Sequence, residues 1–158
     1  MLHPIQSQDE EKFASLVTAF YQSKAALHLI EPEKIRRTLQ LLAAGSPWLA
    51  GYLIESQEQI AGYVLLSFSY SNECGGMILW IEELYVTPQF SGQGLGRATL
   101  KEIEKHYADH CVRLRLEVRA DNENAIGLYR SEGYMELNYR QMVKDLPGGA
   151  DRDISAAR

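Results

Sequence analysis

Residues 80–98 decide the fold, and they read Trp-Ile-Glu-Glu-Leu-Tyr-Val-Thr-Pro-Gln-Phe-Ser-Gly-Gln-Gly-Leu-Gly-Arg-Ala. The first seven residues are mostly branched and aromatic, which is typical of a strand, and Pro88 ends that strand because proline cannot donate to a sheet ladder. Gly92, Gly94 and Gly96 then lead into a run with apolar residues at helical spacing. The stretch therefore predicts a strand, a glycine-rich turn and a helix.

The glycine-rich turn is a candidate anion site. Glycines let the backbone approach a ligand closely, and the unpaired N–H groups at the start of a helix bind anions. The turn could therefore cradle a pyrophosphate, with a simple flexible turn as the alternative. Neither the P-loop sequence nor the spacing of the dinucleotide fingerprint is present here.

The segments before this stretch predict a short strand, two helices and two further strands. A capping box of Ser7 and Glu10 precedes the first helix, and Pro32 and Gly45 bound the second helix. Strands rich in aromatic and branched residues follow, separated by tight turns. The expected strands before the glycine turn cover residues 2–6, 48–55, 60–70 and 77–86.

After the glycine turn we expect a helix, a strand over residues 112–118, a helix over 123–131 and a last extended segment over 134–143. Successive short-loop strands favour antiparallel pairing, whereas the strand–helix–strand unit from Met77 to Val118 needs a right-handed parallel crossover. A mixed α/β sheet is therefore predicted. We expect one domain over residues 1–146 and a flexible tail over residues 147–158, which has little to bury.

Composition limits the classes of function. The 158 residues are 46% apolar and carry a net charge of −5, which fits one globular domain and disfavours nucleic-acid binding. Two cysteines provide no disulfide framework, and no segment reads as a signal peptide or a membrane span. His106 and His110 lack a metal-binding motif, so no metal is predicted. The expected location is the cytoplasm, with no membrane partner.

Glu82 and Glu83 form an acidic pair inside the apolar strand, where burying a charge is costly. Successive strand residues point to opposite faces, so at most one of the two points into the core unless the strand bulges. An amine substrate arrives protonated, and a carboxylate can take that proton or hold the cation. One or both residues could instead simply face solvent.

The motifs after the central strand resemble the GNAT superfamily of N-acetyltransferases. The matching residues are Val86-Thr87-Pro88, Gly92-Gln93-Gly94-Leu95-Gly96, Asn122 with Ala125, Leu128-Tyr129 and Gly133-Tyr134. The resemblance implies a mostly antiparallel mixed sheet of six or seven strands, flanked by about four helices, with two parallel central strands that splay apart. Ser91 departs from the family pattern, which places Arg or Gln there.

The resemblance also implies a site for acetyl-CoA as acyl donor. The pyrophosphate would lie on backbone N–H groups of Gln93, Gly94, Leu95, Gly96, Arg97 and Ala98. The pantetheine arm would lie beside Leu84, Tyr85 and Val86, with Asn122 and Ala125 nearby, and a strand bulge near Leu84 or Tyr85 would aim a backbone donor at the thioester.

Tyr129 would act as the general acid that protonates the leaving thiolate. By likeness to polyamine acetyltransferases, Glu82 is the first candidate base and Glu83 the second. Tyr21 and His28 lie in the region where the family forms its acceptor pocket.

Three functions follow from these expectations. We favour transfer of acetyl to a primary amine of a small molecule, by direct attack with both substrates bound. A protein N-terminus or lysine as acceptor is the second possibility, and a CoA-binding regulatory module without turnover is the third. The resemblance also allows a homodimer.

Overall fold

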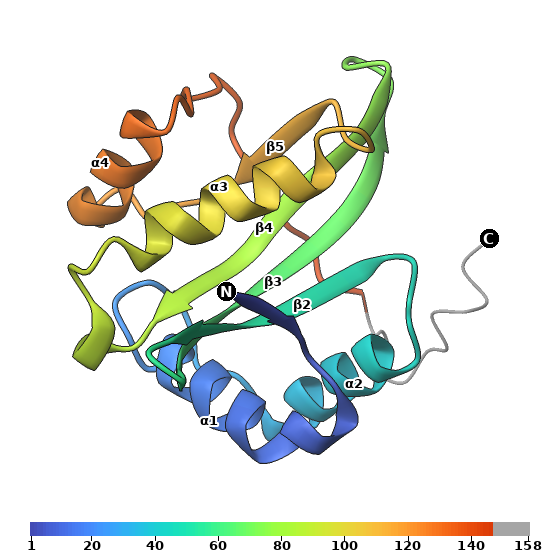
Figure 1. The fold of residues 1–158 in the computed structure, drawn as a ribbon. Helices are drawn as coiled ribbons and strands as arrows, with labels where there is room; N and C mark the ends of the chain where they lie inside the picture. Colours follow the sequence, from blue (N-terminus) through green and yellow to red (C-terminus); the bar gives the residue numbers. More distant parts are fainter. Residues whose placement is uncertain (147–158) are drawn as a thin grey trace.

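One mixed sheet of five strands organises residues 1–146, which are the residues that the computed structural model describes (Figure 1). The sheet order is the chain order. Its strands are β1 (Leu2–Pro4), β2 (Leu49–Ser56), β3 (Gln59–Ser71), β4 (Gly76–Val86) and β5 (Arg113–Leu116). The helices are α1 (Glu10–Tyr21), α2 (Pro32–Ala43), α3 (Leu95–Tyr107) and α4 (Glu123–Ser131), with short 3-10 turns η1 (Ser7–Asp9) and η2 (Pro88–Phe90).

The pairing confirms the expected mixed sheet. β1 to β4 pair antiparallel, whereas β4 and β5, which α3 connects, pair parallel. The parallel ladder runs only from Ile78 beside Arg113 to Ile81 beside Leu116, although β4 continues to Val86. The expected splay between the two parallel strands therefore begins after Ile81.

Two helical layers cover opposite faces of the sheet (Figure 1). On one face, apolar residues of α1 and α2 pack on β2 and β3 in a cluster that includes Phe13, Leu16, Ile35, Leu39, Tyr63 and Leu65. On the other face, α3 and α4 pack in a cluster that includes Val64, Leu66, Leu79, Leu100, Ile103 and Tyr129. Successive side chains of a strand point to opposite faces, so neighbouring residues of β3 belong to different clusters.

A β-bulge interrupts the pairing of β3 with β4 at Glu82. Leu65 pairs with Glu83 and Leu66 pairs with Ile81, so Glu82 is an extra residue without a partner on β3. A bulge re-aims the side chains that follow it. We predicted a bulge near Leu84 or Tyr85, and the structure has it at Glu82, slightly earlier in the same strand.

Three expectations about secondary structure are corrected. The sheet has five strands among residues 1–146, not six or seven, because residues 134–143 form no strand. This segment has no neighbouring strand to pair with, because β5 already ends at Leu116. It meets the chain just beyond that end, where Gln141 donates to Glu117. The predicted strand over 112–118 is correspondingly shorter.

The predicted Ser7–Glu10 capping box is also wrong. Ser7 lies inside η1, and the backbone N–H of Gln6 donates to Asp9 Oδ2 at 2.8 Å, so the capping contact sits one residue earlier. The expected tail over residues 147–158 lies outside the described residues. In residues 1–146 every helix is too short or too polar to cross a membrane.

Candidate active site

The glycine turn positions the start of α3. Gly92 and Gly94 adopt φ values of 75° and 79°, in the left-handed region that favours glycine, and α3 begins at Leu95. The N–H groups of the first helical turn have no carbonyl partner within the helix. Among the predicted pyrophosphate donors, the Ala98 N–H already donates to Gly94 O at 3.0 Å. The remaining N–H groups of the turn are the candidate anion site.

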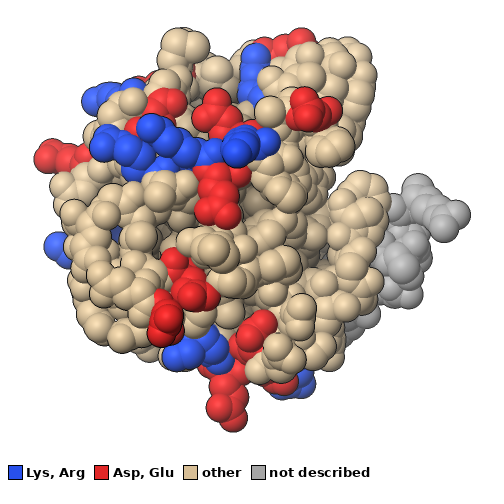
Figure 2. All heavy atoms as spheres, in the orientation of Figure 1, with Lys and Arg blue, Asp and Glu red and all other residues tan. Residues whose placement is uncertain are grey.

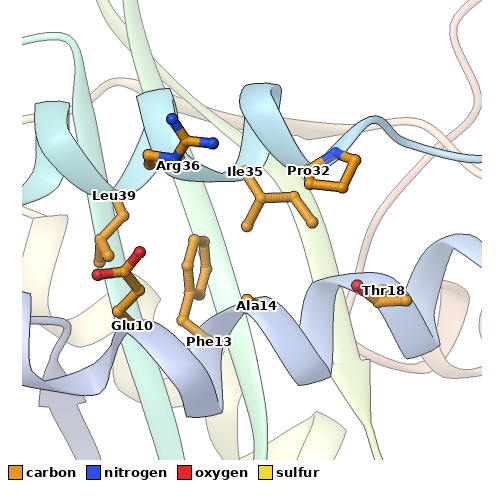
Figure 3. A pocket seen from close by; sticks show the side chains of 8 residues that line it. All are labelled: Glu10, Phe13, Ala14, Thr18, Pro32, Ile35, Arg36 and Leu39. Atoms are coloured by element: carbon orange, nitrogen blue, oxygen red, sulfur yellow. The ribbon is translucent and has the colours of Figure 1, made fainter.

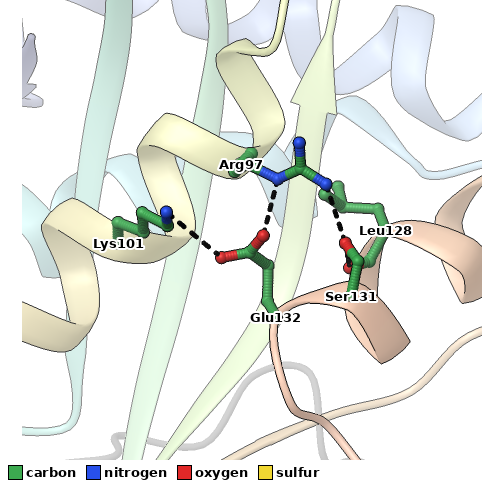
Figure 4. Close-up of polar contacts among 5 residues, drawn as sticks. All are labelled: Arg97, Lys101, Leu128, Ser131 and Glu132. Atoms are coloured by element: carbon green, nitrogen blue, oxygen red, sulfur yellow. Dashed lines mark hydrogen bonds and ion pairs between the residues drawn. The ribbon is translucent and has the colours of Figure 1, made fainter.

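Arg97 links α3 to α4 (Figure 4). Its Nε lies 2.6 Å from Glu132 Oε1, and its Nη2 donates to Ser131 Oγ at 2.8 Å. Lys101 Nζ lies 4.0 Å from the other carboxylate oxygen of Glu132. Gly96 supports the same contact, because a Cβ there would lie 3.1 Å from Leu128 Cδ2. The helix that offers the anion site is therefore tied to the helix that carries Tyr129.

Positive charge gathers along this part of the surface. Figure 2 shows Lys and Arg side chains in a band over α3, with acidic side chains beside them. Arg97 and Lys101 belong to α3, and both form ion pairs with Glu132. The chain is acidic overall, so this band is a local feature that suits a phosphate-bearing ligand.

The edge of β4 beside the splay extends beyond its ladder with β5. Leu84, Tyr85 and Val86 pair with β3 on one side, but they lie beyond the ladder with β5 on the other. Backbone groups that lose a neighbouring strand can pair with an extended ligand. The predicted pantetheine position therefore coincides with a stretch of β4 that lies outside the ladder with β5.

Tyr129 lies in α4 on the α3 face of the sheet, where it packs against the second apolar cluster. Burial raises the pKa of its phenol, which keeps the hydroxyl protonated at neutral pH. Asn122 is the N-cap of the same helix, and its Oδ1 accepts the N–H of Ala125 at 3.3 Å. The cap uses only the oxygen of that side chain, so its amide nitrogen can donate elsewhere.

Glu83 is buried, with 9% of its surface exposed, on the face covered by α1. Tyr21 Oη donates to Glu83 Oε1 at 2.7 Å, and Tyr63 Oη donates to Glu83 Oε2 at 2.5 Å. Burial raises the pKa of the carboxyl, the two phenol hydrogen bonds lower it, and the nearby charge of Glu82 raises it again. The net shift is upward, so Glu83 has more affinity for a proton than an ordinary carboxylate.

The two phenols that bind this carboxylate belong to a cluster of aromatic rings. The centroids of Phe20 and Tyr21 are 5.2 Å apart, those of Phe20 and Tyr85 are 6.1 Å apart, and those of Tyr63 and Tyr85 are 6.3 Å apart. Such rings are favourable neighbours for a cation. A buried carboxylate within aromatic rings is suited to an ammonium group.

The structure separates the other predicted residues from this cluster. Glu82 is exposed and accepts a hydrogen bond from Ser67 Oγ. His28 is exposed on the loop between α1 and α2, and Ser91 is exposed before the glycine turn. Of the four predicted acceptor residues, Tyr21 and Glu83 are in direct contact.

Sequence reasoning missed Tyr63. It is fully buried in β3, 20 residues before its partner Glu83. The only available signal was a tyrosine in the neighbouring strand, and the bulge at Glu82 hides which residues of the two strands meet.

The glutamate and the tyrosine approach the splay from opposite faces of the sheet. Glu83 belongs to the α1 face and Tyr129 packs on the α3 face, with Leu84 of β4 in the same cluster as Tyr129. The ladder between β4 and β5 ends at Ile81, and Glu83 and Leu84 follow that end directly, one on each face of the sheet.

A separate pocket of about 190 Å³ lies between α1 and α2 (Figure 3). Phe13, Ile35 and Leu39 line its apolar part, and Glu10 and Arg36 are the charged residues that line it. None of its lining residues is a predicted site residue. This pocket is therefore formed by the packing of α1 against α2 and is separate from the predicted site.

Comparison with known proteins agrees with this geometry. The family model described as the acetyltransferase (GNAT) family matches residues 12–134. Thialysine N-epsilon-acetyltransferase of Bos taurus is 38% identical over 79 residues, covering 49% of this chain and 46% of the relative. Spermine/spermidine N(1)-acetyltransferase of Bacillus subtilis (strain 168) is 32% identical over 76 residues, covering 43% of this chain and 50% of the relative.

The chain thus spans about half the length of these two curated relatives. A crystal structure of a probable acetyltransferase shares the fold with a TM-score of 0.76 at 22% identity, covering 92% of this chain and 99% of that one. The family match covers the glycine turn, the splay and Tyr129 together. The chain belongs to the acetyltransferase (GNAT) family.

Proposed function

We propose that this protein transfers an acetyl group from acetyl-CoA to the primary amine of a small cationic molecule. The observation that carries the proposal is the position of Glu83, a buried carboxylate within aromatic rings, next to the splay of β4 and β5. The named activities of the two curated relatives, which act on thialysine and on spermine or spermidine, support an amine acceptor.

The donor side fits acetyl-CoA, the acyl-donor substrate, whose thioester a free amine can attack. The first-turn N–H groups of α3 would hold its pyrophosphate, and the open edge at Leu84–Val86 would pair with its pantetheine arm. Asn122 would donate a hydrogen bond from its side-chain N–H to that arm. Tyr129 would give its proton to the departing thiolate, because its raised pKa keeps the phenol protonated until that step.

On the acceptor side we assign the general base to Glu83 before Glu82, which reverses the order expected from the resemblance. Glu83 is buried and has a raised pKa, whereas Glu82 is exposed to solvent. A base of higher pKa accepts the ammonium proton more readily. Glu82 would attract the cation without taking its proton.

Direct transfer within a complex of both substrates is the proposed reaction order. An acyl-enzyme route needs a reactive thiolate, but burial raises the pKa of the Cys111 thiol. Cys74 lies in the turn between β3 and β4, at the opposite end of β4 from Glu83. Neither cysteine suits an acyl carrier.

The test is steady-state kinetics with acetyl-CoA and a panel of lysine, spermidine, butylamine and a peptide with a free N-terminus, scored by thiol release. We expect turnover with the small amines and intersecting initial-velocity lines. Parallel lines would indicate an acyl-enzyme. Turnover only with the peptide would move the assignment to protein acetylation. Binding of acetyl-CoA without any turnover would indicate a regulatory module.

A further inference from the structure

We propose that Tyr21 is a proton relay between the acceptor amine and Glu83, and that Tyr63 is the fixed anchor of the same carboxylate. The inference rests on the proposed function. It concerns how the proton of the ammonium group reaches a base that is almost entirely buried.

The two phenols hold different oxygens of one carboxylate. Tyr21 Oη is 2.7 Å from Oε1, and Tyr63 Oη is 2.5 Å from Oε2. Tyr63 comes from the middle of the sheet and has no exposed surface, so no substrate can reach it. Tyr21 is the last residue of α1 and is partly exposed, so it is the phenol that an acceptor can contact.

The relay is balanced without any further reactant. The ammonium N–H bond breaks and its proton forms a new O–H bond at Tyr21 Oη. The original O–H bond of Tyr21 breaks, and that proton forms an O–H bond at Glu83 Oε1. A cation and a carboxylate become a neutral amine and a carboxylic acid, and the phenol is regenerated.

The environment of Tyr21 favours a concerted transfer. Burial, the Glu83 charge and the hydrogen bond to Glu83 raise its pKa, with a smaller effect of Glu82, so a free tyrosinate is disfavoured. A concerted relay needs no tyrosinate, because the phenol gains one proton as it loses the other. The groups that face Glu83 are Tyr21 from α1, Tyr63 from β3, and Glu82 on its own strand, with the Tyr85 ring beside Tyr63.

Tyr21→Phe and Tyr63→Phe form a matched pair, because each removes one hydrogen bond to the same carboxylate. Either loss raises the pKa of Glu83, which moves the acidic limb of the pH–rate profile to higher pH. Only Tyr21→Phe also removes the relay. We therefore expect the single-turnover rate at the high-pH plateau to fall about 100-fold or more in Tyr21→Phe and by about tenfold or less in Tyr63→Phe, which loses the anchor of the carboxylate but keeps the relay.

The measurement is rapid mixing of enzyme with acetyl-CoA and saturating spermidine or lysine across pH, with thermal denaturation as the check of folding. Glu83→Gln gives the rate without a base, and Tyr21→Phe should approach it. Equal plateaus in the two Phe variants would overturn the relay while leaving the proposed function intact. A wild-type protein that binds acetyl-CoA and acetylates none of the panel amines would overturn both.

Discussion

The rings of Tyr129 and Tyr134 lie with their centroids 5.7 Å apart, and the Tyr134 N–H donates to Tyr129 O at 3.0 Å. Both phenols are partly buried at the end of α4, and burial raises the pKa of each, that of Tyr134 to about 12. The two residues therefore share an environment, although only Tyr129 is proposed to protonate the thiolate. Tyr134 therefore serves as the control residue when the role of Tyr129 as general acid is tested.

Tyr129→Phe should lower kcat by about 100-fold or more, because the thiolate would leave without a proton donor. The affinity for acetyl-CoA should change little, since the ring remains in place. Steady-state kinetics and calorimetric titration of acetyl-CoA separate the two effects. Unchanged turnover would remove Tyr129 from the mechanism.

Tyr134→Phe should keep its activity and gain stability. Among the described residues, the Tyr134 hydroxyl is buried without a hydrogen-bond partner, and such a group costs about 1–3 kcal/mol. Its removal should raise Tm in thermal denaturation. A loss of turnover equal to that of Tyr129→Phe would assign the proton donor to the pair rather than to Tyr129.

Gly94→Trp should abolish saturable binding of acetyl-CoA in calorimetry. A Cβ at Gly94 meets no atom within 4 Å, so the bulky side chain enters the space in front of the α3 N-terminus. Gly45→Trp is the matched control, because Gly45 also has a positive φ and open space but lies at the end of α2. Both variants carry similar backbone strain, so loss of binding in both would refute the anion site.

Glu83→Gln should be inactive yet more stable than wild type at neutral pH. The folded-state pKa of Glu83 lies above its ordinary value of 4.5, so the folded protein binds that proton more tightly than the unfolded chain does. Wild-type stability therefore falls as pH rises from 4.5 through the folded-state pKa, a loss that glutamine does not suffer. Thermal denaturation at several pH values should show the difference in Tm shrinking toward acid.

Glu82→Gln is the control for that experiment. Glu82→Gln removes one charge that raises the pKa of Glu83 but keeps the buried carboxyl, so Tm should still fall as pH rises, unlike in Glu83→Gln. An equal effect in both variants would mean that the environment of Glu83 is not special.

Gly62→Ala should lower Tm by about 5 °C or more, because its Cβ would lie 2.0 Å from Tyr85 O and force β3 and β4 apart. Gly127→Ala should raise Tm by about 2 °C, since Gly127 lies inside α4 with no atom within 4 Å of its Cβ. Thermal denaturation of both variants checks the pair. A stable Gly62→Ala protein would contradict the close strand contact.

The sequence was sufficient for most of the elements, whereas its donor-side residues stay a prediction. Local signals such as the apolar periodicity of 95–107, Pro88 and the glycine turn depend on nearby residues alone, and the structure confirms the strand, turn and helix that they predict. Asn122 and Tyr129 belong to one short helix, so their proximity also follows from sequence. Residues 134–143 form no strand because β5 ends at Leu116, and the local sequence pattern does not show where a neighbouring strand ends.

The acceptor side depends on tertiary contacts that one sequence cannot display. Glu83 meets Tyr21 across 62 residues and Tyr63 across 20 residues. The extra residue in β4 shifts the register between these strands, so counting along the chain does not show which glutamate faces Tyr63. The order of the two candidate bases could therefore not be set before the structure.

The unpaired position at Glu82 is a place where β4 can change its length. Because Glu82 has no partner on β3, deleting it would leave Ile81 beside Leu66 and Glu83 beside Leu65. Residues that pair directly across two strands share a face of the sheet, so Glu83 would stay on the face covered by α1. A single-codon deletion at the bulge would therefore make the ladder regular without exchanging the two sides of the sheet.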